Sequence, residues 1–342
     1  MDFTISPIKV QELAKIADVS QPVISRKFKE EHSGSIKSER NRILGITPEA
    51  IEEYLTAKGQ GHIYQGGAYL FTNCCGGTSK TTSALSVGSS FRRISNPKAS
   101  PIVWIDYDSQ ASLTSVLAGN AMEDTKPVLV NYFEGKAKLD EILTPVGKPE
   151  DNMWVIGSSL NNLYLEKTLS TPQAIRGSMK RLIEDLFTKF GPRAKLLFDS
   201  PPSLSNATNS LTCAFSELQN IYDTKLIVPL RSDKFSFSGS KLIIQELKSL
   251  LEAFNLPDIE KIVFLSSFDR RLKISVDIFK QLLEDPLLKE FVSPVVVRYS
   301  SEISKAHQSN RSIYNGSNSP ASDDYTDLML FIMGYVKSGG NS

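Results

Sequence analysis

The stretch FTNCCGGTSKTTSALSVGSSFRR, residues 71–93, decides the fold, because it reads as a strand, a glycine turn, a Lys-Thr-Thr triplet and a helix in that order. Gly76 and Gly77 allow the backbone to approach a phosphate chain closely, and the helix that follows adds the positive potential of its N-terminus. Lys80 adds a charge, and Thr81 offers a hydroxyl group to Mg²⁺. The stretch therefore predicts a loop that binds nucleotide phosphates.

This loop departs from the common pattern GxxxxGK[ST], because Cys74 stands at its first glycine and Ser79 at its second. It fits the variant arrangement GGxxKTT instead. Taken alone, GGxxKTT is also compatible with a capped turn that binds no phosphate. The residues that we expect to contact the nucleotide here are Gly76, Gly77, Thr78, Ser79, Lys80, Thr81 and Thr82.

Two further segments place carboxylates at the end of apolar strands. IVWIDYDSQASLT, residues 102–114, carries Asp106 and Asp108, and KLLFDSPPSLSNATNSL, residues 195–211, carries Asp199. Strand ends are where an α/β sheet places its site, so we expect these acids near the phosphate loop. An isolated Asp-x-Asp is also common in a turn with two solvated acids. The order and spacing of the three segments together favour a nucleotide site.

The rest of the chain supports an α/β fold, with a doubly wound, mostly parallel sheet of the P-loop NTPase kind. From Ala68 onward, short apolar runs alternate with helical patterns. These runs are AYLFT, IVWID, MWVIG, KLLFD, KLIVPL, IVFLSS and PVVVR. We expect this domain to span residues 63–338, after a small all-helical domain at 1–62 and a glycine-rich linker, GQGHIYQGGA.

The segment ELAKIADVSQPVISRKFKEE, residues 12–31, has the pattern of a helix-turn-helix that binds DNA. Ala14 suits the first helix, Asp18-Val19 the turn, and Ile24 the buried side of the second helix. Side chains suited to base edges and phosphates in a major groove are Gln21, Ser25, Arg26 and Lys29. An ordinary helical hairpin with solvated charges has the same pattern.

The overall composition limits the alternatives. The chain has 39 lysines and arginines against 38 acidic residues, so its net charge does not predict nucleic-acid binding. No apolar run approaches the ~20 residues of a membrane span, and no secretory signal is evident, so we expect a cytoplasmic protein without membrane partners. The three cysteines, Cys74, Cys75 and Cys213, fit neither a disulfide framework nor zinc-site spacing.

These motifs resemble the ParA/MinD family of deviant Walker A ATPases, and within it the ParA partition proteins, over residues 68–328. NCCGGTSKTT resembles the Walker A box, IDYDSQASLT the Walker A′ segment, and FDSPPSLSNATNSL the Walker B segment. The resemblance implies the cofactors ATP and Mg²⁺. It places Lys80 at the β- and γ-phosphates, Thr81 and Asp199 at Mg²⁺, and Asp108 at the attacking water. It also implies Asp106 in support of the metal shell and Asn209 near the γ-phosphate.

The same resemblance implies a function in plasmid partition. We expect a homodimer that forms with ATP, coats nucleoid DNA without sequence preference, and is stimulated by a centromere-binding adaptor protein. The N-terminal domain would bind the operator and repress the protein's own operon. Arg298, in VVVRYSSE, is the leading candidate for non-specific DNA contact, whereas Arg270 and Arg271 also fit a solvated face.

One departure from the family opens two other functions. The family's signature lysine, which reaches the partner's phosphate across the dimer, falls on Cys75 here, and Lys234 is a candidate to replace it. Some relatives that position protein cargo also lack this lysine, so a cargo-positioning ATPase is one alternative. The other is a nucleotide-sensing transcriptional repressor with little ATP turnover.

Overall fold

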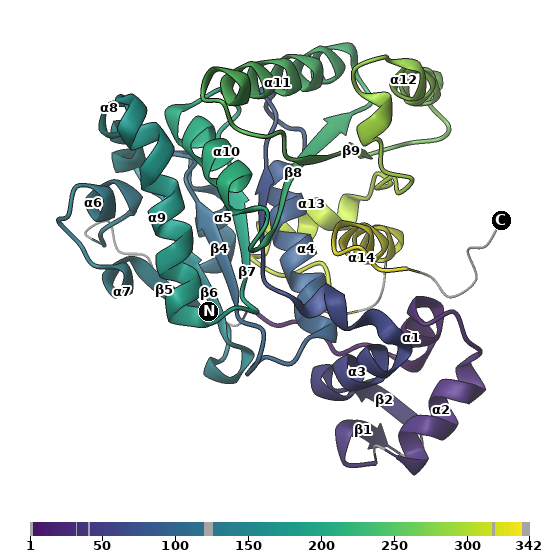
Figure 1. The fold of residues 1–342 in the computed structure, drawn as a ribbon. Coiled ribbons are helices and arrows are strands. Elements are labelled where there is room, and N and C mark those ends of the chain that lie inside the picture. Colours follow the sequence, from purple (N-terminus) through teal and green to yellow (C-terminus); the bar gives the residue numbers. More distant parts are fainter. Residues whose placement is uncertain (1–2, 32, 40–41, 120–125, 317–318, 337–342) are drawn as a thin grey trace.

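The computed structural model describes residues 3–31, 33–39, 42–119, 126–316 and 319–336. Its main body is a seven-stranded sheet with helices on both faces, which confirms the predicted fold class (Figure 1). The strand order is β5-β6-β4-β7-β3-β8-β9, and all neighbours are parallel except β5 and β6. The strands are β3 (Gly67–Phe71), β4 (Ile102–Asp106), β5 (Leu143–Val146), β6 (Met153–Ile156), β7 (Lys195–Asp199), β8 (Asp223–Arg231) and β9 (Glu260–Ser266).

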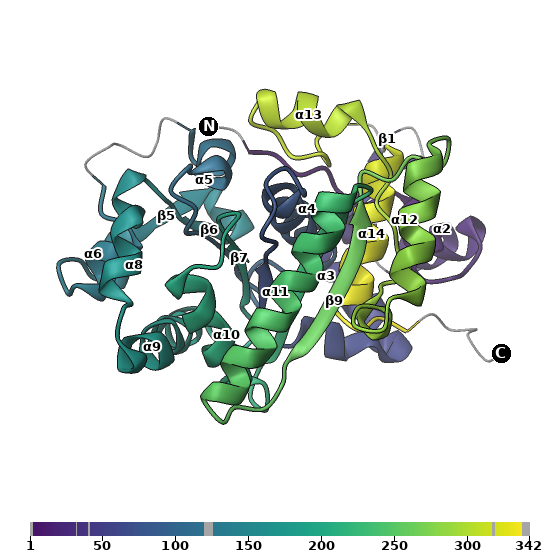
Figure 2. The same ribbon diagram turned by 90° about the horizontal axis from the view of Figure 1, so that it is seen from above.

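Helices cover both faces of this sheet, because the side chains of each central strand alternate between two apolar clusters. The helices α4 and α14 lie on one face of the sheet, and α9, α10 and α11 lie on the other (Figure 2). In β3, Tyr69 and Phe71 belong to the apolar cluster of the first face, and Ala68 and Leu70 to that of the second. The helices are α4 (Lys80–Ile94), α5 (Ser112–Leu117), α6 (Leu129–Phe133), α7 (Leu139–Ile142), α8 (Leu165–Thr168), α9 (Pro172–Phe190), α10 (Asn206–Leu218), α11 (Lys234–Ala253), α12 (Lys273–Glu284), α13 (Ser301–Gln308) and α14 (Pro320–Ile332). Single 3₁₀ turns are η5 (Pro149–Asp151), η6 (Leu160–Tyr164) and η7 (Lys289–Phe291).

The strand register brings the carboxyl ends of three central strands to one level. Asp199 of β7 pairs with Phe71 of β3 on one side and with Asp106 of β4 on the other. The loop after Phe71 and both carboxylates therefore meet at one edge of the sheet. Gly88, in the middle of α4, allows this helix to lie close to β4, because a Cβ atom at Gly88 would come 2.5 Å from the Trp104 ring.

The N-terminal segment is not all-helical, which corrects the prediction for residues 1–62. An antiparallel hairpin pairs Ile36 with Ile46, and Ile43 of the same hairpin packs against the core. Its strands were missed because charged and polar residues separate the few apolar ones. The elements are α1 (Val10–Ile16), α2 (Gln21–Glu30), η1 (Ser33–Ser35), β1 (Ile36–Glu39), β2 (Arg42–Ile46), α3 (Pro48–Leu55), the π-helical turn η2 (Thr56–Gln60) and η3 (Gly61–Tyr64).

The predicted linker is a packed part of the structure rather than an open connection. Ile63 and Tyr64 are buried, and the Tyr64 hydroxyl donates to Ile94 O at 3.1 Å. The N-terminal segment lies beside α4 and α14 (Figure 1), and Arg93 pairs with Glu12 at 2.6 Å. Its side chains thus share the core with the sheet domain. The division into 1–62 and 63–338 stays a prediction, and residues 1 and 338 lie outside the described residues.

At the edges of the sheet, one predicted strand is absent and one strand of the structure was not predicted. PVVVR, 294–298, forms no regular strand: Ser293 N and Val297 N donate to β9 carbonyls, but Pro294 between them has no N–H to continue the ladder. The short β5 was missed because Pro145 interrupts its apolar pattern. Such a proline is tolerated at an edge strand. Within the described residues, no helix is long and apolar enough to cross a membrane.

Candidate functional site

The loop between β3 and α4 carries the predicted phosphate contacts. Gly77 and Ser79 have φ values of +69° and +74°, so the backbone adopts the left-handed region twice before the helix begins. Glycine favours this region, and Ser79 occupies it although it is not glycine. A Cβ atom at Gly76 would meet nothing within 4 Å, so space is open above the loop. Thr81 and Thr82 follow in the first turn of α4.

Lys80 folds back over this loop. Its Nζ donates to the Cys75 carbonyl at 3.0 Å, and the side chain is almost fully buried. Burial lowers the pKa of Lys80, whereas the carboxylates of Asp199 and Asp108 act in the opposite direction. The loop therefore holds one ammonium group against its own carbonyl, at the point where an anion would replace that contact.

Thr81 and Asp199 form the predicted metal side of the site. The Thr81 hydroxyl donates to Asp199 Oδ2 at 2.6 Å, while Asp199 Oδ1 is buried and has no hydrogen-bond partner among the described residues. Burial raises the pKa of Asp199 well above its usual value, and the neighbouring Asp106 adds to this. An orphaned carboxylate oxygen beside a hydroxyl group fits Mg²⁺ and its water ligands.

No group of three His, Cys, Asp or Glu side chains in the described part of the chain forms a metal cage. A divalent cation at Thr81 and Asp199 would thus take most of its ligands from phosphates and water, which is the usual arrangement for Mg²⁺ in nucleotide sites.

Asp106 and Asp108 have different surroundings, although one residue separates them. Asp106 is fully buried, and burial raises its pKa to about 7. Its Oδ1 accepts from Asp108 N at 3.1 Å and its Oδ2 accepts from Thr114 N and Oγ1 at 2.8 and 2.7 Å. Asp108 is half-buried, and its carboxylate accepts from Gln110 N at 2.9 Å. Asp106 therefore holds the loop through hydrogen bonds, and Asp108 is the more accessible of the two acids.

Cys75 packs against the first turn of α11. Its Sγ donates to Phe235 O at 3.2 Å, and a Cβ atom at Gly239 would come 2.6 Å from this sulfur. The buried Asn73 also joins the loop to α11, because its Nδ2 donates to Ser240 Oγ at 2.8 Å and its Oδ1 accepts from Cys75 N at 3.0 Å. Sequence reasoning missed Asn73, although it lies two residues before Cys75 in the quoted motif.

Lys234 is the first residue of α11 and is exposed. Because the thiol of Cys75 contacts the carbonyl of Phe235, the next residue, the backbone of Lys234 lies near Cys75. That Lys234 replaces the signature lysine stays a prediction. Asn209 lies in the first turn of α10, which begins after the loop that follows Asp199, and it is half-buried.

The predicted DNA-reading residues lie on one side of α2. Gln21, Arg26 and Lys29 are exposed and Ser25 is half-buried, whereas Ile24 and Phe28 of the same helix are fully buried. The two predicted helices are present, and their function in DNA binding stays a prediction.

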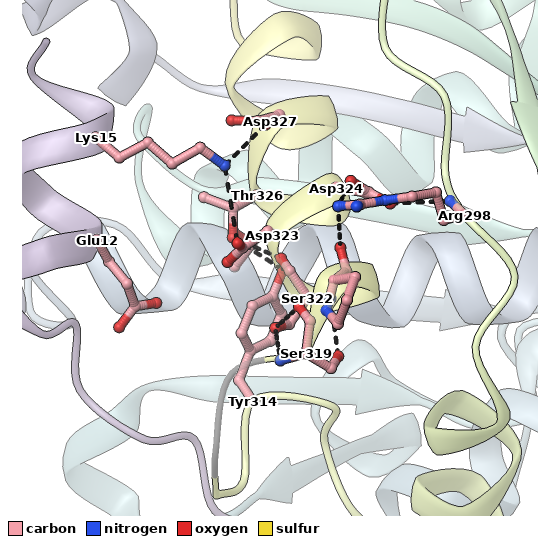
Figure 3. Close-up of polar contacts among 12 residues, drawn as sticks. Glu12, Lys15, Arg298, Tyr314, Ser319, Ser322, Asp323, Asp324, Thr326 and Asp327 are labelled. Atoms are coloured by element: carbon pink, nitrogen blue, oxygen red, sulfur yellow. Dashed lines mark hydrogen bonds and ion pairs between the residues drawn. The ribbon is translucent and has the colours of Figure 1, made fainter.

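Arg298, the other predicted DNA contact, is engaged within the chain (Figure 3). Its Nε and Nη2 donate to the two carboxylate oxygens of Asp324 at 2.8 and 2.7 Å, and Nη2 also donates to Pro320 O at 3.2 Å. The hydrogen bonds to Asp324 raise the pKa of Arg298. The pairing occupies Nε and Nη2, and the Arg298 side chain is 52% exposed, so contact with a DNA phosphate stays a prediction.

Comparison with known proteins gives three kinds of match. Residues 69–260 match the AAA domain family. The cell division protein PomZ of Myxococcus xanthus is 25% identical over 86% of this chain and 86% of its own length. The chromosome-partitioning ATPase Soj of Treponema pallidum is 25% identical over 64% of this chain and 78% of its own.

Solved structures share the fold. An aspartate-to-alanine variant of McdA from Cyanothece, in complex with ATP, superposes with a TM-score of 0.63 at 17% identity. The match covers 80% of this chain and 98% of McdA. At this identity the likeness establishes the fold, which is that of the ParA-like P-loop NTPases.

Proposed function

Because this chain belongs to the AAA domain family and has the ParA-like P-loop NTPase fold, we propose that it is an ATPase that acts as a dimerising switch. The observation that carries the proposal is the meeting of Lys80, Thr81, Asp108 and Asp199 at one edge of the sheet. A lysine, a hydroxyl group and two acids at a glycine-rich loop are the parts that phosphoryl transfer to water requires.

Each side chain has a distinct task in this proposal. Lys80 leaves the Cys75 carbonyl and binds the β- and γ-phosphates, and Asn209 lies near the γ-phosphate. Thr81 and Asp199 hold Mg²⁺, which would neutralise charge on the phosphate oxygens. Asp108 orients the attacking water, and Asp106 fastens the loop that carries Asp108. Steady-state ATP hydrolysis with and without Mg²⁺ tests the assignment: turnover that does not depend on Mg²⁺ would contradict it.

The biological task that we propose is DNA partition. The proposal is supported by the name of one relative, Soj of Treponema pallidum, a chromosome-partitioning ATPase. In this proposal the chain dimerises with ATP, binds DNA without sequence preference and responds to a centromere-binding adaptor. The N-terminal segment would bind the operator. Arg298 would contact a DNA phosphate through donors that its hydrogen bonds to Asp324 and Pro320 leave available, because those bonds use only Nε and Nη2 and its side chain is 52% exposed.

Cys75 favours a second candidate, the positioning of protein cargo. A relative over most of the chain, PomZ of Myxococcus xanthus, is named a cell division protein. A neighbouring gene for a centromere-binding protein would favour partition over this candidate. The third candidate is a repressor with little ATP turnover. Operator binding and ATP hydrolysis, measured on one preparation, distinguish it from the partition and cargo-positioning ATPases, because it would bind the operator but hydrolyse little ATP.

Cys75→Lys tests whether the missing cation limits this protein. If it does, the new ammonium group should reach the partner's phosphate and raise ATP-dependent dimerisation or hydrolysis, because a well-placed arginine finger contributes about 10³–10⁵ in rate. If Lys234 already supplies the charge, activity should stay level or fall. Lys234→Ala decides between the two: full dimerisation and turnover in that variant would eliminate Lys234 as the substitute.

Arg26→Ala should weaken binding to the protein's own promoter and leave ATP turnover intact, because Arg26 lies on the exposed side of α2, outside the phosphate loop. One good base contact contributes about 1–3 kcal/mol, so the loss should be clear in an assay at fixed salt. Lys58→Ala removes an exposed cation after α3 and serves as the matched control. Equal promoter affinity of Arg26→Ala and Lys58→Ala would count against α2 as the reading helix.

A further inference from the structure

A chain of hydrogen bonds leads from Asp106 to the surface turn η6. Thr114 Oγ1 donates to Asp106 Oδ2 at 2.7 Å and accepts from Ser158 N at 2.8 Å. Ser158 Oγ accepts from Asn162 Nδ2 at 2.8 Å. All four residues are at most 4% exposed, so water does not compete for these contacts.

The members of this chain come from four separate places in the fold. Asp106 ends β4, Thr114 lies in α5, Ser158 follows β6, and Asn162 lies in η6. The chain adds side-chain hydrogen bonds to elements of which β4 and β6 are already paired through their backbones. If one hydrogen bond of this chain is lost, the side chains on either side of it are expected to be less firmly oriented.

In the turn η6, Asn162 is the side chain that is buried, whereas the apolar side chains are exposed. Leu160, Leu163 and Tyr164 are each more than 60% exposed, and Asn162 is the buried side chain between them. The hydrogen bond from Asn162 to Ser158 thus fixes the turn to the end of β6, next to the Thr114 contact.

The other end of the chain reaches the acid that we assign to the attacking water. Asp106 Oδ1 accepts from Asp108 N, so the rotation of the Asp106 carboxylate sets where the Asp108 backbone lies. The Thr114 hydroxyl fixes that rotation from the opposite oxygen. Thr114 N also donates to Asp106, and this backbone contact does not require the threonine side chain.

We propose that Thr114, Ser158 and Asn162 are positioning residues, which act through Asp106 to hold Asp108 where it orients the attacking water. The inference rests on the proposed ATPase function and adds residues to its site that touch neither nucleotide nor metal.

The pair Thr114→Val and Thr114→Ser tests the proposal. Valine keeps the shape and the backbone contact but removes the hydroxyl, whereas serine keeps the hydroxyl. The buried hydrogen bonds of the Thr114 hydroxyl to Asp106 and Ser158 are lost in Thr114→Val, so we expect kcat to fall about tenfold or more, with the Kd for ATP within about threefold of the parent value. Thr114→Ser should retain the parent kcat.

Asn162→Ala tests the far end of the chain, and Asn161→Ala, at the exposed neighbouring position, is its control. We expect kcat to fall in Asn162→Ala alone. The double variant Thr114→Val with Asn162→Ala should be no slower than Thr114→Val, because both changes break one chain. Two results would contradict the proposed hydrogen-bond chain: losses of kcat that multiply in the double variant, or equal kcat values for Asn162→Ala and Asn161→Ala.

The parent and Lys80→Ala are measured in the same assay, so that the two ideas can fail separately. An active parent with unchanged kcat in Thr114→Val would overturn the positioning role alone. A similar fall of kcat in Thr114→Val and Thr114→Ser would assign the effect to packing, and this also overturns it. A parent without turnover would overturn both the positioning role and the ATPase function.

Discussion

Lys80→Ala is expected to abolish ATP binding. Lys80 is the only lysine in the loop and first helical turn at residues 72–82, and its ammonium group already lies within that loop, 3.0 Å from the Cys75 carbonyl. A phosphate chain brings several negative charges into a partly buried site, where an unpaired charge is costly. Titration of the variant with a fluorescent ATP analogue in the presence of Mg²⁺ should therefore show no saturation at concentrations that saturate the parent.

Lys98→Ala is the control for this change, because it removes an exposed lysine from the same domain without touching the loop. It should bind the ATP analogue as the parent does. Unchanged nucleotide affinity in Lys80→Ala would remove the basis for the phosphate-loop assignment.

Asp108→Ala should spare ATP binding and slow hydrolysis. The cradle around Lys80 and Thr81 does not depend on the Asp108 side chain, whereas a group that orients or deprotonates the attacking water typically contributes about 10²–10⁴ in rate. Single-turnover hydrolysis at saturating ATP measures the step directly, and the Kd for ATP is measured on the same sample.

Asp108→Asn keeps the size of the side chain and removes its charge. It should be impaired in hydrolysis as well, since the carboxylate is what attracts the water's protons. Parent-like hydrolysis in both variants would move this role to another residue.

Many of the candidate site residues were predictable because they lie at strand ends, and a polar residue after a short apolar run indicates a strand end in the sequence. Asp106 and Asp199 each close an apolar run, so a parallel sheet places both at its carboxyl edge. That β4 and β7 are neighbours there depends on the strand order, which only the structure shows. The contact between Thr81 and Asp199 joins residues 118 positions apart, yet both stood in recognisable motifs.

Contacts between ordinary polar residues far apart in the chain were not predictable. Asn73 binds Ser240 across 167 positions, and nothing in the local sequence of either residue indicates the other. Arg298 was predicted to contact DNA from its place in VVVRYSSE, and this contact stays a prediction. Its hydrogen bonds to Asp324 on α14 were not predictable, because the packing of that helix is visible only in the fold. The hairpin at residues 36–46 was missed because so few of its residues are apolar.

The molar mass of Asp108→Ala in Mg·ATP and in Mg·ADP tests the central claim, an ATP-driven dimerising switch, most directly. This variant is expected to keep ATP intact, so light scattering during gel filtration can compare the two nucleotide states without turnover. We predict the mass of two chains with ATP and of one chain, 37.9 kDa, with ADP. The same mass in both nucleotides, with ATP binding verified on the same sample, would contradict the switch.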